Sequence, residues 1–337
     1  MRTKIPHISF CLALTAIAAL AQTKPAFEVA TIKPSAPLDQ AKLIASIQAG
    51  GKLPIGANID GSRAEYKYLD LKSLMSYAYG VKPYQITGPD WMATTRFDIE
   101  AKMPDGAKKD DASKMLQSLL EERFHLQVHH ETTEHPVLAL VAGKNGPKLK
   151  ASAGKPAAID ESAPLKQGET KIDGPDGPIH VKIDISTGSS VMDLGLKGKM
   201  SYKVNPQTLT MHIDFSMMTM AGLADMMTQL MTQLGGPAAT GKQIVDMTGI
   251  QGNYDASMEL SLQEIINLAR AQGANIPNLP GAAAPGAGGA AGQASDPGAS
   301  GTSVTDAVNA MGLKLENRKA PVDQLIVDRI DKTPTDN

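Results

Sequence analysis

Three imidazoles and two carboxylates lie within seven residues of this sequence, a cluster of the side chains that bind divalent metal ions. The cluster runs from His129 to His135 and includes His130, Glu131 and Glu134. A zinc-protease helix has the pattern His-Glu-x-x-His, which places two imidazoles on one helical face. Here Glu134 stands where the second histidine is required, and the strand-like pattern of the segment turns His129 and His130 to opposite faces. Two interpretations stay open: a weak metal site of His129, His130, Glu134 and His135, which would suit a metal-dependent hydrolase, or a solvated hairpin.

A second group of soft metal ligands is a methionine-rich stretch, whose thioethers could bind Cu(I). Its members are Met211, Met217, Met218, Met220, Met226, Met227 and Met231. Met220, Met227 and Met231 fall on the apolar stripe of a predicted helix, where methionine commonly fills gaps in a core. A copper-handling role is therefore a third and weaker interpretation.

Two aspartates and the single tryptophan are the other candidates for a site. Asp98 and Asp255 each follow an aromatic residue directly, and we favour bonding of local backbone amides over acid–base chemistry for both. Trp91 follows Asp90 in a predicted turn, where it would be either a binding anchor or a cap on a small core. No serine lies in a Gly-x-Ser-x-Gly motif, so a serine hydrolase would have no visible nucleophile. We predict no catalytic residue and no cofactor. The residues predicted to bind a ligand are Trp91, Asp90, Asp98, His129, Glu131 and Asp255.

Charge and the amino-terminal residues limit the class of protein. The chain has 337 residues, with 33 Lys and Arg against 35 Asp and Glu, which argues against a dedicated nucleic-acid-binding protein. The single cysteine, Cys11, excludes a disulfide framework. Residues 1–21 have the features of a signal peptide: basic Arg2 and Lys4, an apolar stretch over residues 8–20, and a predicted cut after Ala21. We therefore predict a periplasmic or secreted protein with no membrane span after cleavage.

Periodic apolar residues predict the elements that would position these groups. Helical spacing predicts helices over residues 71–79, 112–123, 219–234, around 262–269 and 303–311. Alternation predicts, among others, strands over residues 125–131, 137–142, 313–318 and 322–330, with turns at Pro136 and Pro321. The order of elements is alike in the two halves, so we interpret the chain as a duplicated α+β unit. Each unit would pack two helices on a small, mostly antiparallel sheet.

Composition sets the predicted domain boundaries. The first unit covers residues 22–150 and the second covers residues 206–337. A Pro-, Gly- and Lys-rich insertion and connecting segment covers residues 151–205, and a flexible Gly/Ala-rich linker interrupts the second unit at 274–302. Whether the two units share one core or lie apart stays open.

Several sequence blocks carry a family resemblance. They are Phe27-Glu-Val-Ala-Thr-Ile-Lys-Pro34, Ile86-Thr-Gly-Pro-Asp-Trp91, Arg96-Phe-Asp-Ile-Glu-Ala-Lys102, Met115 to His129, Gly146-Pro-Lys-Leu-Lys150, Val245 to Asp255 and Met311-Gly-Leu-Lys-Leu-Glu316. Together they resemble a large soil-associated family of exported bacterial proteins of unknown function. Related domains are joined to BlaR-type membrane metallopeptidases, which implies an external sensing or binding role. The chain differs from the family pattern in its Gly/Ala-rich linker, its methionine-rich helix and His130.

The order of elements is also similar to the short N-terminal domains of secretins and TonB-dependent receptors, although a shared fold does not fix function. We therefore predict an exported, non-enzymatic binding or sensing module of the cell envelope. Its partner would be an envelope protein or another extracytoplasmic ligand. The metal-dependent hydrolase built on residues 129–135 is the alternative.

Overall fold

The computed structural model describes residues 24–48, 53–235, 242–262 and 304–335. The predicted signal peptide, the predicted linker at 274–302 and most of the helix predicted around 262–269 lie outside these described residues. Within the described ranges, no helix is both long enough and apolar enough to cross a membrane.

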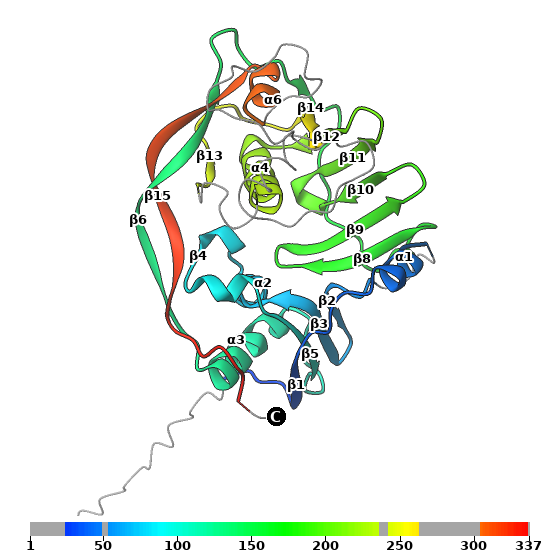
Figure 1. Ribbon diagram of the computed structural model, residues 1–337, viewed down its shortest axis with the longest axis vertical. Helices are drawn as coiled ribbons and strands as arrows, with labels where there is room; N and C mark the ends of the chain where they lie inside the picture. The colour runs from blue at the N-terminus through cyan, green and yellow to red at the C-terminus, as the bar shows by residue number, and fades with distance from the viewer. Residues whose placement is uncertain (1–23, 49–52, 236–241, 263–303, 336–337) are drawn as a thin grey trace, which may run out of the picture.

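Eleven strands form one large antiparallel sheet in the order β1-β5-β3-β2-β8-β9-β10-β11-β12-β14-β7 (Figure 1). Their bounds are β1 Val29–Pro34, β2 Gly56–Asp60, β3 Arg63–Asp70, β5 Arg96–Lys102, β7 Lys150–Ala151, β8 Glu169–Gly174, β9 Gly177–Asp184, β10 Ser189–Asp193, β11 Lys199–Asn205, β12 Thr210–Met218 and β14 Tyr254–Ser261. The central strands β8 to β11 come from the segment predicted to be an insertion, and they join the strands of the two halves into one sheet.

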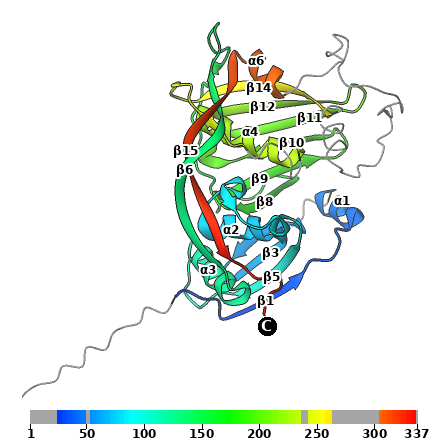
Figure 2. The same cartoon turned by 60° about the vertical axis from the view of Figure 1, so that its left-hand side comes forward.

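The remaining four strands form a second sheet in the order β13-β6-β15-β4. They are β4 Ile86–Thr87, β6 Gln127–Ala142, β13 Ile244–Asp246 and β15 Leu313–Arg329. β6 and β15 pair antiparallel along most of their length, and we call this pair the β6–β15 ribbon. It curves along one side of the molecule (Figure 2). β13 pairs parallel with β6, and β4 pairs parallel with β15.

The helices of the described residues are α1 Gln40–Gln48, α2 Leu71–Tyr79, α3 Asp111–Phe124, α4 Met220–Gly235 and α6 Val304–Ala310. Short 3-10 helices are η1 Pro83–Gln85, η2 Asp90–Ala93 and η3 Gly195–Lys197. In Figure 1, α2 and α4 lie between the ribbon and the large sheet. The helices predicted at 71–79, 112–123, 219–234 and 303–311 are confirmed by α2, α3, α4 and α6, with small shifts of their ends.

The boundaries of α2 follow from local chemistry. The Asp70 carboxylate accepts a hydrogen bond of 2.8 Å from the Ser73 backbone N–H, which satisfies one of the free donors of the first turn. Gly80 ends the helix in the left-handed conformation, with φ of 67°. Leu71 and Leu74 are fully buried on the inner face. The sequence signals at both ends therefore specify this helix.

The predicted fold class is wrong. The protein is not a duplicated pair of helices on a small sheet, because the large sheet runs through both halves and a second sheet joins them again. The likeness to the short domains of secretins and TonB-dependent receptors rested on the order of elements in the predicted small units, and the large continuous sheet contradicts it. The strands predicted at 125–131 and 137–142 are one strand, β6, and those at 313–318 and 322–330 are one strand, β15.

Two prolines account for the prediction of four short strands where the structure has two long ones. Pro136 and Pro321, which we expected to form turns, lie inside β6 and β15, where they face Lys319 and Glu134 respectively. Proline removes one backbone donor, so it is tolerated in a strand only where that donor would face solvent. The ribbon has only two strands between its contacts with β13 and β4, so each strand has a free edge there. Proline can thus be accommodated without ending either strand.

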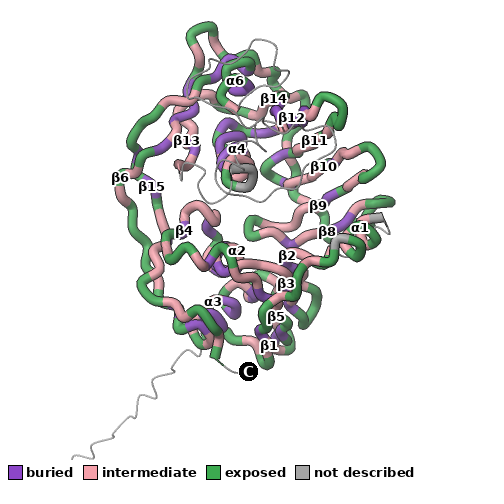
Figure 3. The backbone as a smooth tube through the Cα atoms, in the orientation of Figure 1, coloured by how far each residue is buried: buried purple, intermediate pink, exposed green. Residues whose placement is uncertain are grey.

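Two main clusters of buried apolar residues form the core, and Figure 3 shows their place along the backbone. The first surrounds α2 and α3, and the rings of Phe97 and Phe124 meet edge to face there with centroids 5.2 Å apart. The second lies between α4, α6 and strands β12 and β14. A third, small cluster of Val137, Ala320 and Val322 lies in the β6–β15 ribbon.

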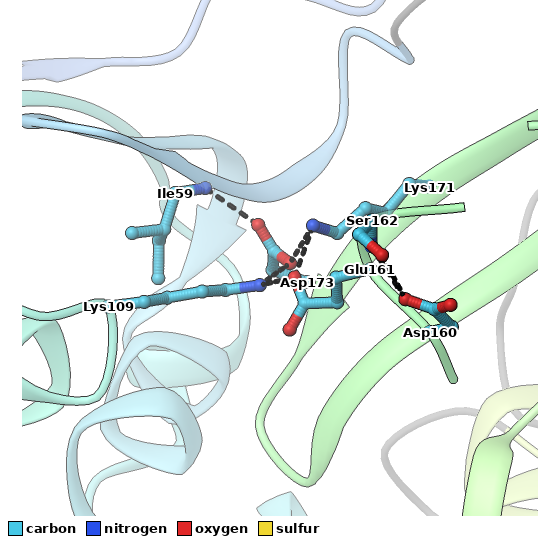
Figure 4. Close-up of polar contacts among 7 residues, drawn as sticks. All are labelled: Ile59, Lys109, Asp160, Glu161, Ser162, Lys171 and Asp173. Atoms are coloured by element: carbon cyan, nitrogen blue, oxygen red, sulfur yellow. Dashed lines mark hydrogen bonds and ion pairs between the residues drawn. The ribbon is translucent and has the colours of Figure 1, made fainter. Parts of the chain in front are cut away.

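A buried carboxylate stabilises the junction between β2 and β8, which pair only through Ala57 and Asp173. Asp173 is 3% exposed, and its Oδ2 accepts a 2.7 Å hydrogen bond from the Ile59 backbone N–H. Its Oδ1 lies 2.6 Å from Lys109 Nζ (Figure 4). Glu161 also contacts Lys109, at 2.6 Å, so this ion pair is part of a small network. Burial of a carboxylate is costly unless it is paired and hydrogen-bonded, and here both conditions hold.

We predict that Asp173→Ala lowers the free energy of unfolding by about 2–4 kcal/mol, because it leaves Lys109 and the Ile59 N–H without their buried acceptor. Urea unfolding followed by fluorescence of Trp91, the only tryptophan, measures the change. Asp60→Ala is the matched control: Asp60 is an exposed aspartate at the end of the same β2 strand, and its loss should cost less than about 0.5 kcal/mol. Equal effects of the two substitutions would contradict the role of Asp173.

Candidate ligand-binding cavity

A cavity of about 370 Å³ lies between α2, η1, the β8–β9 turn, η3 and α4. Its wall is mostly apolar and includes Tyr77, Tyr84, Pro178, Ile179 and Met226. Small-molecule sites are typically mostly apolar hollows of this order of size with few polar groups. The cavity therefore has the size and the surface of a site for a small organic ligand.

The end of α2 places one side of the wall. After Gly80 the chain reverses, and the Ser76 hydroxyl donates a hydrogen bond to the Val81 carbonyl oxygen. The backbone N–H of Lys82 donates to the side-chain oxygen of Gln85 at 2.9 Å. These two bonds fix the residues that lead into η1, so Lys82 and Tyr84 are held at the cavity.

The β8–β9 turn places the opposite side. Gly174 pairs with Gly177, which leaves Pro175 and Asp176 as the two residues of the turn. Gly177 has φ of 117°, a conformation that other residues rarely adopt, and a Cβ on Gly174 would lie 2.9 Å from the Gly177 carbonyl oxygen. Both positions therefore require glycine, and the tight turn presents Asp176 to the cavity.

Two lysines share one carboxylate at the cavity wall. Lys82 and Lys197 both contact Oδ2 of Asp176, the latter at 2.5 Å. Burial opposes charge on Asp176, but the hydrogen bonds from both lysines outweigh it and lower the pKa of this carboxyl. For Lys82, burial is likewise outweighed by Asp176, and its pKa is raised. Burial and the charge of Lys82 lower the pKa of Lys197. Two ammonium groups thus compete for one carboxylate.

A second polar pair links η1 to α4 beside the cavity. The Tyr84 hydroxyl donates a 3.1 Å hydrogen bond to Oδ1 of Asp225. Burial and the charge of Asp225 raise the pKa of Tyr84, so its hydroxyl stays protonated and keeps donating. Burial also raises the pKa of Tyr77 to about 12. The polar groups at the wall are thus largely committed to one another, and they tie together the elements that enclose the cavity.

The structure places Asp98 and Asp255 in two matching local sites and not at the cavity. Oδ1 of Asp98 accepts from the Ser35 hydroxyl at 2.6 Å and from the Tyr68 backbone N–H at 2.8 Å. Oδ1 of Asp255 accepts from the Ser152 hydroxyl at 2.6 Å and from the Met217 backbone N–H at 3.0 Å, and these bonds lower its pKa. The bonds to backbone amides are those that the structural interpretation predicted.

Trp91 and Asp90 also lie away from the cavity. Trp91, in η2, is half-buried and packs against the first core cluster, while Asp90 is exposed beside it. Neither residue lines the cavity. The structure does not bring Trp91, Asp98 and Asp255 together, and a binding role for any of them stays a prediction.

The histidine cluster is spread along the β6–β15 ribbon. Nδ1 of His129 lies 2.9 Å from Asp328 and Nδ1 of His130 lies 3.4 Å from Asp323, while the ring of His135 meets the Thr133 hydroxyl at 2.7 Å. The Glu131 and Glu134 side chains are exposed. In the part of the chain that the structure describes, no group of three or more His, Cys, Asp or Glu could hold a metal ion. This geometry gives the metal-dependent hydrolase no support.

The methionines of the proposed copper site mostly have packing roles. Met211, Met218, Met220 and Met227 are buried in the second core cluster. Met226 lines this cavity, and Met217 lines a second one described below. Gap filling by flexible side chains accounts for the buried members.

Sequence reasoning missed the residues of the cavity. Lys82, Asp176 and Lys197 come from a helix end, a turn and η3, and two of them lie in the segment that we interpreted as an insertion. One signal was present: Gly174-Pro-Asp-Gly177 is a turn motif between runs of alternating residues. It could have predicted the hairpin, although not its partner across the cavity.

Comparison with known proteins gives a family match without a function. A family model described as "Protein of unknown function (DUF3738)" matches residues 72–330, which is more than half of the chain. No curated protein and no solved structure matches the chain.

We predict that the Asp176 carboxylate contributes to stability at neutral pH and loses this contribution in acid. Its pKa is lowered in the folded protein, so the contribution is complete above the ordinary value near 4 and disappears as the pH falls through the lower folded value. Asp176→Asn should therefore lower the free energy of unfolding by about 1 kcal/mol at pH 7, a modest figure because Asp176 is partly exposed. The difference should shrink near pH 3.

Urea unfolding of both proteins at the two pH values measures this effect. Asp105→Asn, at an exposed aspartate after β5, is the control and should change stability little at either pH. A difference between Asp176→Asn and the parent protein that stays constant from pH 7 to pH 3 would count against the assigned pKa direction.

Proposed function

The chain belongs to the DUF3738 family, whose description names no function, and from this starting point we propose that it is an exported binding module. Its cavity would hold a small, largely apolar ligand outside the cytoplasm. The observation that carries the proposal is the cavity of about 370 Å³ with an apolar interior and mutually paired polar groups.

Export is supported by the sequence of the first 21 residues. A basic start, an apolar stretch and small residues at positions 19 and 21 are the features that a signal peptidase requires. The ligand would accordingly be met in the cell envelope or outside the cell. We also propose, as a partner, an envelope protein that inserts an apolar group into the cavity.

Binding accounts for the cavity better than catalysis does. A catalytic site needs a nucleophile or base that is free to reach a reacting atom. Lys82 and Lys197 instead contact Asp176, the Tyr84 hydroxyl donates to Asp225, and the Ser76 hydroxyl donates to backbone. Polar groups used in this way hold the walls in place, and the apolar interior is then preorganised for a ligand.

A fluorescent probe tests the proposed binding. N-phenyl-1-naphthylamine is neutral and apolar, and its fluorescence should rise saturably on addition of the protein, with one site per chain. Gln229→Trp places an indole in the wall of the cavity on α4 and should abolish the signal. Leu196→Trp adds the same ring at a position that is 70% exposed and does not line the cavity, so binding should persist. Absence of saturation, or equal binding by the two variants, would exclude this function.

Export has its own test. When the full chain is produced with a carboxyl-terminal tag in a bacterium with two membranes, we expect mature protein in the periplasm or medium that begins at Gln22. Ala21→Asp places a charge at the cleavage site and should cause the uncleaved form to accumulate. Edman sequencing and cell fractionation read the result, and an uncleaved protein that stays in the cytoplasm would rule out export.

A further inference from the structure

A second cavity, of about 490 Å³, lies at β9 and β10 beneath the segment of residues 155–166. Side chains of a strand alternate between the two faces of the sheet. In β9, Ile179 lines the first cavity together with Gly177 and Pro178 at the turn, whereas the adjacent His180 and the more distant Lys182 line the second. The two cavities therefore lie on opposite faces of the same strand, and a ligand of the second would not enter the first.

The segment above the second cavity is held in place by close packing. A Cβ on Gly154 would lie 3.1 Å from the Met217 sulfur, and one on Gly195 would lie 3.6 Å from Ile159, so the chain passes close to the sheet at both points. The Asp160 carboxylate accepts from the backbone N–H of Ser162 at 2.9 Å and also from its hydroxyl. These contacts give the cavity a defined roof.

The lining of this cavity has more positive than negative side chains. Four lysines face three carboxylates: Lys155, Lys166, Lys182 and Lys199 against Asp160, Glu169 and Asp193. This gives an excess of one positive charge, before any contribution from His180.

The three carboxylates are already bonded within the protein. Asp160 is held by Ser162, and Asp193 pairs with Lys199 at 2.8 Å. Glu169 lies opposite Lys182 in the sheet, but its Oε2 accepts a 3.0 Å hydrogen bond from the backbone N–H of Lys166.

The three remaining lysines of the lining are not held by ion pairs within the described part of the protein. Among the described residues, Lys155, Lys166 and Lys182 make no ion pair within 4.0 Å, whereas Lys199 pairs with Asp193. Three ammonium groups at one hollow can donate hydrogen bonds to an anion without breaking an existing ion pair.

We propose that the second cavity is a binding site for a phosphate-type oxyanion, either free or as the terminal group of a larger phosphorylated molecule. Lys155, Lys166 and Lys182 would supply the charge, and His180, which is half-buried at the base, would supply a further donor. A tetrahedral oxyanion suits several lysines because its oxygens point in different directions and each accepts from a separate donor. The proposal does not depend on the function of the first cavity.

Titration of the mature protein with inorganic phosphate and with phenyl phosphate tests this site, using calorimetry in low-salt buffer. We expect saturable binding to one site per chain. Lys182→Gln and Lys166→Gln should each weaken it roughly tenfold, the effect of losing one charge-assisted hydrogen bond. Lys203→Gln is the matched control, because Lys203 is an exposed lysine of β11 that does not line the cavity, and it should leave binding unchanged.

The outcomes separate the possible sources of the anion. Tighter binding of phenyl phosphate supports a larger phosphorylated ligand, and equal binding of both compounds supports the free anion. Failure to saturate, or equal weakening by Lys182→Gln and Lys203→Gln, overturns the proposal. Gln229→Trp should bind phosphate like the parent protein, so a failure of the first cavity is distinguishable from a failure of the second.

Discussion

Pairing between β6 and β15 is the constraint on which the rest of the structure depends. The two strands come from opposite halves of the chain and pair in one continuous register from Leu313 to Val327, and the register shifts before Arg329. Each then holds a short strand of the other half: β4, which follows η1, pairs with β15, and β13, which follows α4, pairs with β6. Side-chain bonds add to this anchoring, since Gln85 donates to the Asp323 carbonyl oxygen and the Ile244 N–H donates to the Thr228 hydroxyl. The ribbon thereby fixes η1 and α4, the two elements that face each other across the first cavity.

Buried and half-buried carboxylates stabilise the irregular places in the large sheet. Tyr68 and Met217 both have φ of 56°, a strained conformation for residues with side chains, and each occurs where the pairing register of its strand shifts. Asp98 and Asp255 accept from the backbone N–H groups of these two residues and so satisfy donors that the ladder leaves free. The neighbouring Leu69 lines the first cavity and Met217 itself lines the second. The two aspartates do not line the cavities themselves, but they stabilise the bulges that orient these two side chains.

The sequence could predict what is local and could not predict what is paired at long range. Asp70 and Gly80 lie at opposite ends of α2, and each bonds to a residue three or four positions away. The ends of this helix were therefore predictable from the local sequence. The alternation of residues along a strand identifies the strand but does not identify the strand with which it pairs. Pro136 and Pro321 illustrate this limit. Proline is excluded from most positions inside a strand, and the free edges of the ribbon allow each proline to lie within a long strand. Strands β8 to β11 lie in a segment whose composition resembles a linker, so composition predicted neither the central sheet nor the place of Asp176.

Alternation along β9 explains how one hairpin can serve two chemically different hollows. Its residues at 179 and 181 face apolar partners, with Ile179 opposite Ile172 and Val181 opposite Met192. The intervening His180 and Lys182 face the polar side, where Lys171 and Glu169 lie opposite them. The apolar and the charged environments therefore lie on opposite faces of a single strand. Because the same backbone hydrogen bonds fix both sets of side chains, a substitution such as Lys182→Gln changes the charge of one hollow and leaves the wall of the other in place. The strand that composition identified as part of an insertion is for this reason the shared wall of both candidate sites.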